Sequence, residues 1–135
     1  MFVPMRSGGG IIMERIQVAK DFHSGELECP CCKGLVYDQR MIDLLQIMRD
    51  IMGIPFVIRS YYRCRIYNDK LLNSSNNSQH LMGKAADIST AGWSGNQKWE
   101  LISCAVRYRL SIGLYKNHIH LDNRVGSPNI WYGSY

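Results

Sequence analysis

Two short clusters hold three of the four histidines of this 135-residue chain. The first cluster places His80 a few residues before Asp87, with Gly83 between them. The second cluster is the segment 118–122, which reads His-Ile-His-Leu-Asp. Zinc binds imidazole nitrogen and carboxylate oxygen readily, and catalytic zinc sites combine three protein ligands with a water. Together the clusters indicate one metal site built from two distant segments.

The second cluster has the spacing of a β-strand with one polar face. Alternate residues of a strand share a face, so His118, His120 and Asp122 should point one way while the intervening apolar residues enter the core. Taken alone, this pattern also fits a solvated polar face without a metal. His80 and Asp87 favour the metal, with one of the two histidines of the strand as the third ligand. The chain has no His-Glu-x-x-His sequence, which excludes the common helix-borne protease site.

The first cluster resembles a family signature. Residues 78–87 match every fixed position of the Ser-x-His-x-x-Gly-x-Ala-x-Asp signature of the zinc D-alanyl-D-alanine carboxypeptidase superfamily. This superfamily includes VanX-type dipeptidases, phage L-alanyl-D-glutamate endopeptidases and, as a fold relative, the hedgehog signalling domain. Residues 60–68 resemble its Ser-Gly-Tyr-Arg segment, with Tyr61 in place of the usual glycine, and residues 118–122 match its third motif. The likeness spans roughly residues 21–124.

The resemblance implies a role for each site residue. Three side chains would hold Zn²⁺: His80, Asp87 and His120. Three would line the substrate cleft: Arg63, Ser78 and Gln79. In that set, Arg63 would bind a substrate carboxylate or carbonyl through its planar guanidinium, and Ser78 would brace the site. His118 would be the catalytic histidine, which moves a proton or stabilises the tetrahedral oxyanion while zinc activates a water and polarises the scissile carbonyl.

One position departs from the family pattern. VanX-type members carry a glutamate three residues before the last ligand, and Asn117 stands at that place here. Either His118 serves alone as the base, or a carboxylate enters from elsewhere, with Asp122 as a local candidate for orienting a histidine. Taken singly, Asp87 would more often cap a turn and Arg63 would more often form a surface ion pair. The metal site therefore depends on all three segments occurring together.

The strands and helices expected around these residues are typical of an α+β fold. We expect a small antiparallel sheet with packed helices and a zinc site in a surface cleft, as in hedgehog and D-Ala-D-Ala peptidase domains. The expected strands are 54–60, 84–89, 111–115 and 118–122, and a helical turn is expected at 65–68. Residues 1–20 are expected to form a flexible N-terminal arm and residues 21–135 a single zinc peptidase domain. The tail from Arg124 onward is expected to pack across the domain surface.

Two helices are predicted from apolar periodicity. The first spans 38–52, with Asp38 as N-cap and Gly53 as the C-terminal stop. Its apolar stripe is Met41, Leu44, Leu45, Met48 and Met52. Core packing is favoured over an adaptable methionine-rich binding face, because the methionines share the stripe with leucines. The second helix spans 96–108, and its expected inward residues are Trp99, Ile102 and Val106, flanked by Leu101 and Ala105.

The five cysteines leave several interpretations open. They are Cys29, Cys31, Cys32, Cys64 and Cys104. Their odd number argues against a complete disulfide framework. The first three have the spacing of half a zinc knuckle, but no second pair follows at finger-like spacing, and Cys64 is the other candidate nearby in the chain. Buried thiols or one disulfide are favoured over a structural metal and over reactive thiols.

Composition and charge narrow the class of protein. Apolar residues make up 46% and charged residues 20%, which is ordinary for a globular protein. The net charge of +5 suits an anionic partner such as a nucleic acid, a membrane surface or an acidic wall polymer, but no basic run indicates a nucleic-acid arm. No apolar stretch approaches the roughly 20 residues of a membrane span, and the N-terminus lacks the apolar core of a signal peptide. We expect a monomer that is made in the cytoplasm and acts on the cell wall after release.

The predicted function is zinc-dependent hydrolysis of a peptide bond in bacterial peptidoglycan. The enzyme would be a D-Ala-D-Ala carboxypeptidase or an L-Ala-D-Glu endopeptidase, in the style of a phage or prophage endolysin. A second hypothesis is a zinc-binding module that has lost catalysis and serves wall or protein contact, which the missing Glu-x-x-His supports. A third is a nucleic-acid zinc module built on Cys29–Cys32 and the basic charge.

Overall fold

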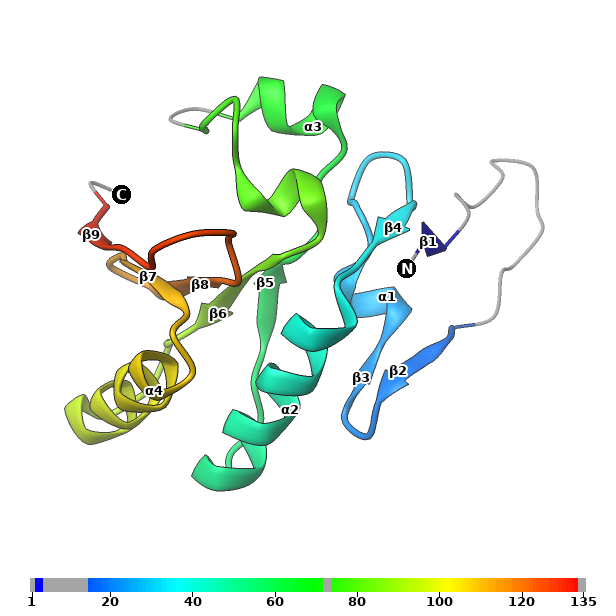
Figure 1. Ribbon diagram of the computed structural model, residues 1–135. Coiled ribbons are helices and arrows are strands. Elements are labelled where there is room, and N and C mark those ends of the chain that lie inside the picture. Colours follow the sequence, from blue (N-terminus) through cyan, green and yellow to red (C-terminus); the bar gives the residue numbers. More distant parts are fainter. Residues whose placement is uncertain (1, 4–14, 72–73, 134–135) are drawn as a thin grey trace.

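A five-stranded sheet forms the centre of the computed structural model, which describes residues 2–3, 15–71 and 74–133 (Figure 1). The strand order is β5 (Ile58–Ser60), β6 (Ala85–Ser89), β8 (His118–Asp122), β7 (Ser111–Leu114) and β9 (Ile130–Tyr132). Neighbouring strands are antiparallel, except that β9 runs parallel to β7. The sheet and its packed helices confirm the predicted α+β class. The tail was expected on the surface, and part of it extends the sheet as an edge strand.

The central strands β6 and β8 present apolar side chains on one face and polar side chains on the other. In their register, Asp87 lies opposite His120 and Ile88 lies opposite Ile119. The two isoleucines are buried in the hydrophobic core. The predicted alternation of segment 118–122 is therefore confirmed, and it gathers the polar residues of both strands on the face away from the core.

The helix α2 (Gln39–Met52) supplies much of the core. It begins after Asp38, whose carboxylate accepts a hydrogen bond from the backbone N–H of Met41 at 3.3 Å. It ends at Gly53, which has a left-handed φ of +67°. Its buried residues are Met41, Ile42, Leu44, Leu45 and Met48. The predicted helix, its caps and its role in core packing are confirmed.

The helix α4 (Gly95–Arg107) is present as predicted, but of its three predicted inward residues only Ile102 packs against the core. Ser94 and Gln97 form a capping box at its start. Trp99 and Val106, expected inside, are 69% and 62% exposed. The buried residues are Leu101, Cys104 and Ala105. Since α4 packs against both α2 and β7, the small side chains of Cys104 and Ala105 allow an approach that a tryptophan would block.

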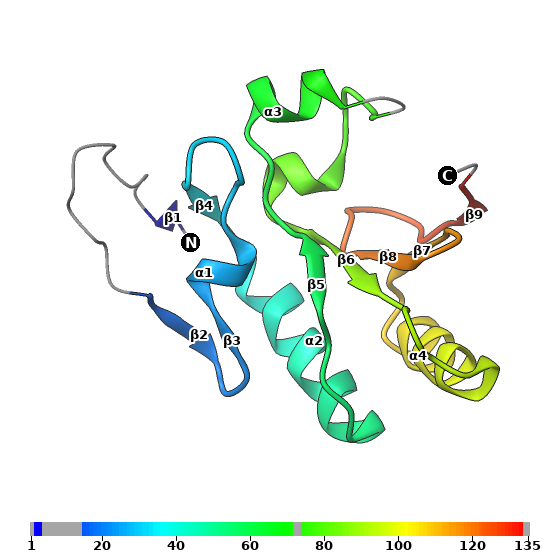
Figure 2. The same ribbon diagram turned by 180° about the vertical axis from the view of Figure 1, so that it is seen from behind.

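Short elements surround the sheet. Two pairs of strands form separate ribbons: β1 (Phe2–Val3) with β4 (Leu35–Val36), and β2 (Gln17–Ala19) with β3 (Phe22–His23). The remaining helices are α1 (Ser24–Leu27), α3 (Arg65–Lys70) and the 3₁₀ helix η1 (Gln79–Met82). The β2–β3 hairpin lies beside α2 and places Val18 in the core (Figure 2). Within the described ranges, every helix is too short or too polar to cross a bilayer.

Candidate metal centre and cleft

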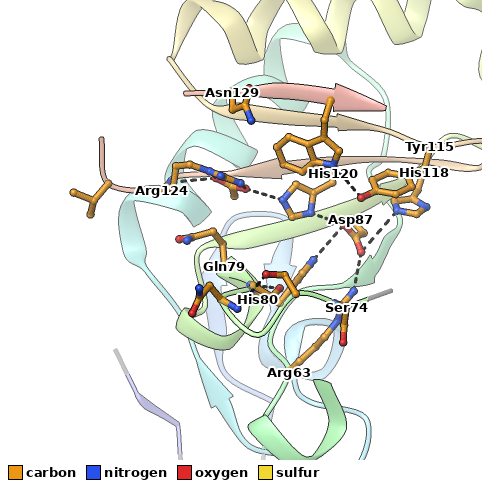
Figure 3. Close-up of a pocket in the computed structure, with 16 residues that line it drawn as sticks. Arg63, Ser74, Gln79, His80, Asp87, Tyr115, His118, His120, Arg124 and Asn129 are labelled. Atoms are coloured by element: carbon orange, nitrogen blue, oxygen red, sulfur yellow. Dashed lines mark hydrogen bonds and ion pairs between the residues drawn. The ribbon is translucent and has the colours of Figure 1, made fainter. Parts of the chain in front are cut away.

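The three predicted metal ligands converge on the polar face of the sheet (Figure 3). His80 Nε2 and His120 Nδ1 lie 3.3 and 3.0 Å from the same oxygen of Asp87, Oδ1. One ligand atom from each residue lies within 4.8 Å of the others. The exposed fractions are only 2%, 6% and 8% for His80, Asp87 and His120. Segments that are distant in sequence thus form one compact buried donor set.

The turn between the first two ligands explains how they meet. His80 lies on η1, whose first turn is capped by Ser78 Oγ, which accepts from the His80 backbone N–H at 3.3 Å. Gly83 ends η1 with a φ of +65°. A Cβ at Gly83 would overlap the carbonyl oxygen of Val36, so glycine is required by both backbone conformation and space. The chain then enters β6 directly, which carries Asp87.

His80 presents a lone pair to Asp87, as a metal ligand must. Its Nδ1 lies 2.6 Å from the carbonyl oxygen of Tyr61, which can only accept, so Nδ1 carries the ring proton. In the neutral ring, Nε2 is then an acceptor facing the carboxylate oxygen, which is also an acceptor. Burial is the main reason why the pKa of His80 lies below its ordinary value, so the ring is neutral. A cation bound by both atoms would resolve this mismatch.

His120 is oriented from behind by a second carboxylate. Its Nε2 donates to Asp122 Oδ2 at 2.8 Å, which directs Nδ1 toward Asp87. Arg124 in turn donates to both oxygens of Asp122 at 2.9 and 2.7 Å. Such partners fix the ring orientation and tautomer of a metal-binding histidine. Asp122 is fully buried, which makes it the orienting carboxylate that the sequence offered as a local candidate.

The electrostatics of the centre favour a charged carboxylate. Burial disfavours the ionised form of Asp87, but its two neighbouring imidazoles, His80 and His120, outweigh burial and hold the pKa of Asp87 well below the usual range. For Asp122, burial is likewise outweighed by hydrogen bonds from Arg124 and His120, and the pKa is lowered. Burial lowers the pKa of His120, but its bonds to Asp122 and Asp87 outweigh that effect and raise it.

His118 stands beside the centre, separate from the three converging ligand atoms. Its Nε2 is 3.9 Å from Asp87 Oδ2, and its ring stacks on Tyr115 at a centroid distance of 4.4 Å. A guanidinium nitrogen of Arg59 lies 3.4 Å from Nδ1. Burial is the first cause that lowers the pKa of His118, and the charge of Arg59 adds to it against the opposing charge of Asp87. A neutral ring held by Arg59 at Nδ1 carries its proton on Nε2.

The predicted substrate-binding residues line the same cavity. Arg63 donates from Nε to Ser60 Oγ at 3.0 Å and from a terminal nitrogen to Asp87 Oδ2 at 3.1 Å. Ser78 and Gln79 lie on the wall formed by η1. All three expected cleft residues are therefore placed together with the metal centre.

The cavity has a volume of about 600 Å³ and a polar wall that contains two arginines (Figure 3). It is lined by Arg63, Ser74, Ser75, Asn77, Ser78, Gln79, His80, Asp87, Tyr115, His118, His120, Asp122, Arg124, Val125, Asn129 and Trp131. Sequence reasoning missed Arg59, Arg124 and Trp131 as neighbours of the site. Arg124 follows Asp122 closely, and that spacing was an available signal. Trp131 arrives through the pairing of β9 with β7, for which the sequence pattern offers no signal.

Asn117, which stands where VanX-type members carry a glutamate, supplies no carboxylate to the cleft. Asn117 lies at the exposed turn before β8, and its carbonyl accepts from the Thr90 backbone N–H at 3.0 Å. Among the described residues, the carboxylates that line the cavity are Asp87 and Asp122, and both are engaged with histidine and arginine. Within the described chain, His118 is the histidine of the cleft that is neither one of the three converging ligands nor a residue that orients them.

The donor set fits zinc. Two imidazoles and one carboxylate are the chemistry of a catalytic zinc site with three protein ligands. The outward nitrogens of His80 and His120 are both committed to acceptors, and their inward nitrogens meet at Asp87. His80, Asp87 and His120, which all line the cavity, would hold the ion.

Comparison with known proteins agrees with this geometry. The sequence profile of the family described as Peptidase M15 matches residues 20–122. A comparison with curated proteins finds no match. The matched region covers most of the chain and includes all three motif segments, and the family implies a zinc-dependent metallopeptidase acting on peptidoglycan-type peptides. This chain belongs to the Peptidase M15 family, within the zinc D-alanyl-D-alanine carboxypeptidase superfamily.

Proposed function

We propose that the protein hydrolyses a peptide bond in the stem peptides of bacterial peptidoglycan, as a D-Ala-D-Ala carboxypeptidase or an L-Ala-D-Glu endopeptidase. The observation that carries the proposal is the convergence of His80, Asp87 and His120 in a cavity that also contains His118 and Arg63. A metal centre, a proton-exchanging group and a carboxylate-binding group thus share one surface. This is the set of parts that metal-assisted peptide hydrolysis requires.

Zinc held by the three ligands would supply Lewis acidity toward the scissile carbonyl and an acidified water. The chain's own residues then divide the remaining work. Arg59 at Nδ1 leaves the Nε2 proton of His118 directed toward the cleft. We assign His118 the stabilisation of the oxyanion that develops on the carbonyl oxygen, and the exchange of a proton with the substrate. Asp122 keeps His120 oriented during this chemistry.

The two arginines of the cavity wall suit a substrate with free carboxylates. Arg63 and Arg124 enter the cavity from opposite walls, and each presents a planar set of donors. Arg63 is assigned to a substrate carboxylate or carbonyl near the scissile bond. Peptidoglycan stem peptides carry such groups at D-Glu and at the terminal D-Ala.

We also propose a lytic setting for this activity, as in a phage or prophage endolysin. The net charge of +5 favours approach to anionic wall polymers. In this setting the protein is made in the cytoplasm and reaches the wall after release.

The test is digestion of purified peptidoglycan and of defined muropeptides with the zinc-loaded protein, followed by mass spectrometry. Loss of a terminal alanine identifies the carboxypeptidase, and a break between L-Ala and D-Glu identifies the endopeptidase. Activity should disappear with a chelator. It should fall by about 10²- to 10⁴-fold in His118→Ala, the range of general acid–base contributions. Bound zinc in His118→Ala should equal that of the wild type.

A second function has one observation in its favour: the cavity offers, within the described chain, no carboxylate outside the network of His80, His120 and the arginines. The protein would then be a zinc-binding module that attaches to the wall without cutting it. Binding to peptidoglycan with full zinc content and intact muropeptides would establish this function and refute the hydrolase.

A further inference from the structure

Four of the five cysteines come together at a second place, apart from the cleft ligands. Cys29, Cys31 and Cys32 lie on the loop between α1 and β4, and Cys64 immediately precedes α3. This loop and the chain entering α3 lie side by side in both views (Figure 1 and Figure 2). Their four sulfur atoms all lie within 4.8 Å of one another. We propose that this cluster is a structural zinc site with four thiolate ligands.

The distances between the sulfurs suit a metal rather than a disulfide. The Sγ atoms of Cys31 and Cys64 are 3.4 Å apart, and those of Cys29 and Cys31 are 3.8 Å apart. A disulfide requires about 2.05 Å, and all four cysteines are free thiols here. In a tetrahedral site with zinc–sulfur bonds of about 2.3 Å, the edges between sulfurs are about 3.8 Å. These two distances, and the limit of 4.8 Å on the others, are compatible with such a tetrahedron.

Backbone donors point at three of the sulfurs. The N–H of Cys64 donates to Cys29 Sγ at 3.4 Å, that of Gly34 to Cys32 Sγ at 3.4 Å, and that of Tyr67 to Cys64 Sγ at 3.5 Å. A neutral thiol is a weak acceptor, whereas a thiolate bound to a metal gains from such bonds. Three of the four sulfurs therefore accept backbone hydrogen bonds that would stabilise metal-bound thiolates.

The loop that carries the first three cysteines is closed by its own backbone. The N–H of Cys29 donates to the Gly34 carbonyl at 2.8 Å, and the N–H of Lys33 donates back to the Cys29 carbonyl at 2.9 Å. Lys33 adopts a left-handed φ of +60°, which tightens the turn. Cys29 is buried while Cys31 is exposed, so a cation has a path from solvent to the cluster. Four soft protein ligands leave no open position, which indicates a structural role.

The location explains what such a site would hold in place. Cys64 directly follows Arg63, and the N–H of Tyr62 donates to the Leu27 carbonyl at 3.1 Å. Pro30 of the cysteine loop shares a cavity of about 210 Å³ with Arg63 and His118. Zinc at the cluster would therefore tie the loop before β4 to the segment that delivers Arg63. This role is independent of whether the cleft hydrolyses peptides.

The decisive experiment removes the cleft site and asks whether zinc remains. His80→Ala combined with His120→Ala, purified under reducing conditions, should retain one zinc per chain, while the wild type contains two. X-ray absorption on this variant should show zinc surrounded by sulfur alone at about 2.3 Å. A zinc-free variant, nitrogen or oxygen ligands in its spectrum, or iron in place of zinc would overturn the proposal.

Matched cysteine variants supply the second measurement. Cys31→Ser combined with Cys64→Ser should lose one zinc and keep the one in the cleft. Cys104→Ser, which changes a cysteine of α4 far from the cluster in the fold, should keep both. Loss of no zinc in the double cysteine variant would contradict a four-thiolate site. If this variant does not fold, the absorption spectrum of the histidine variant decides alone.

Discussion

The planar guanidinium of Arg63 lines the cavity and donates a hydrogen bond to Asp87, one of the three candidate metal ligands. Its bonds to Ser60 and Asp87 fix the guanidinium at the edge of the cleft. Arg63→Lys keeps the charge but loses the fork of donors. We expect kcat/KM on a muropeptide to fall about 10- to 100-fold, which corresponds to losing one charge-assisted hydrogen bond of about 1.5–3 kcal/mol.

The neighbouring Arg65 supplies the control for this substitution. It lies on α3, where it donates to the Asn76 carbonyl at 2.8 Å and lies near Asp69, outside the lining of the main cavity. Arg65→Lys should leave kcat/KM unchanged, and both variants should keep the zinc content of the wild type. Equal activities of the two variants would remove Arg63 from substrate binding.

Asp122 tests the orienting contact at His120. Asp122→Asn keeps the shape of the side chain but removes the charge that holds the Nε2 proton and pairs with Arg124. We expect the affinity of the cleft for zinc to fall by about 10- to 100-fold, as for other such contacts. Competition with a chromogenic chelator measures this change. Asp43→Asn, at an exposed position of α2, is the matched control, and an affinity equal to that of the control would contradict the role of Asp122.

At the residue scale, the spacing of residues within short motifs predicted which side chains converge. His80, Asp87 and His120 belong to motifs whose internal spacing fixes their direction on a turn or a strand, so their convergence was predictable. Arg59 and Trp131 reach the centre through strand pairings that link distant segments, and one sequence cannot specify these. The meeting of Cys64 with the other three cysteines is of the same kind.

Among the elements, the turn from η1 to β6 most directly controls the geometry of the site. Gly83 and Gly53 both have left-handed φ values, +65° and +67°. A Cβ at Gly83 would overlap the Val36 carbonyl, whereas a Cβ at Gly53 has no atom within 4 Å. Gly53→Ala should cost about 1 kcal/mol of stability for the backbone conformation alone. Gly83→Ala should cost more than about 3 kcal/mol, because strain and overlap add.

Urea unfolding of the two glycine variants measures the difference in stability. The comparison isolates the close approach of η1 to β4, since the backbone strain is nearly the same in both. Equal losses would show that the Gly83 turn adapts without disturbing β4. Zinc affinity should follow stability only for Gly83→Ala, because Gly53 lies at the far end of α2.

The two long helices show what periodicity does and does not specify. For α2 four of the five residues of the predicted stripe are buried, Met52 is partly buried against the core, and the buried Ile42 was not predicted. For α4 the apolar residues are spread around the helix. The prediction placed the large side chain of Trp99 in the core, and this was wrong. The close packing of α4 on α2 and β7 selected Leu101, Cys104 and Ala105, and Trp99 remained outside. The distance at which two elements pack depends on the tertiary structure, and the spacing of apolar residues along one helix does not specify it.

In the whole molecule, the end of the chain completes the cleft. The family match stops at residue 122, yet Arg124, Val125, Asn129 and Trp131 all line the cavity. The β9 strand pairs with β7 and brings Trp131 against Gly113, where any side chain would collide with the indole. The cleft is therefore assembled from the region that matches the family and from the segment that follows it.

Trp131 is the residue through which the tail acts. Its Nε1 donates to the Tyr115 hydroxyl at 3.0 Å, its ring lies 5.2 Å from that of His120, and Arg124 lies over it at 5.1 Å. Trp131→Ala removes the hydrogen bond and the cation–π contact, so Arg124 and Tyr115 lose a support worth about 1–2 kcal/mol. We expect kcat/KM to fall about 5- to 30-fold while zinc remains bound. Tyr132→Ala alters the adjacent residue of β9, which is 84% exposed, and should keep full activity; an equal loss in both variants would mean that the strand, and not the indole, supports the cleft.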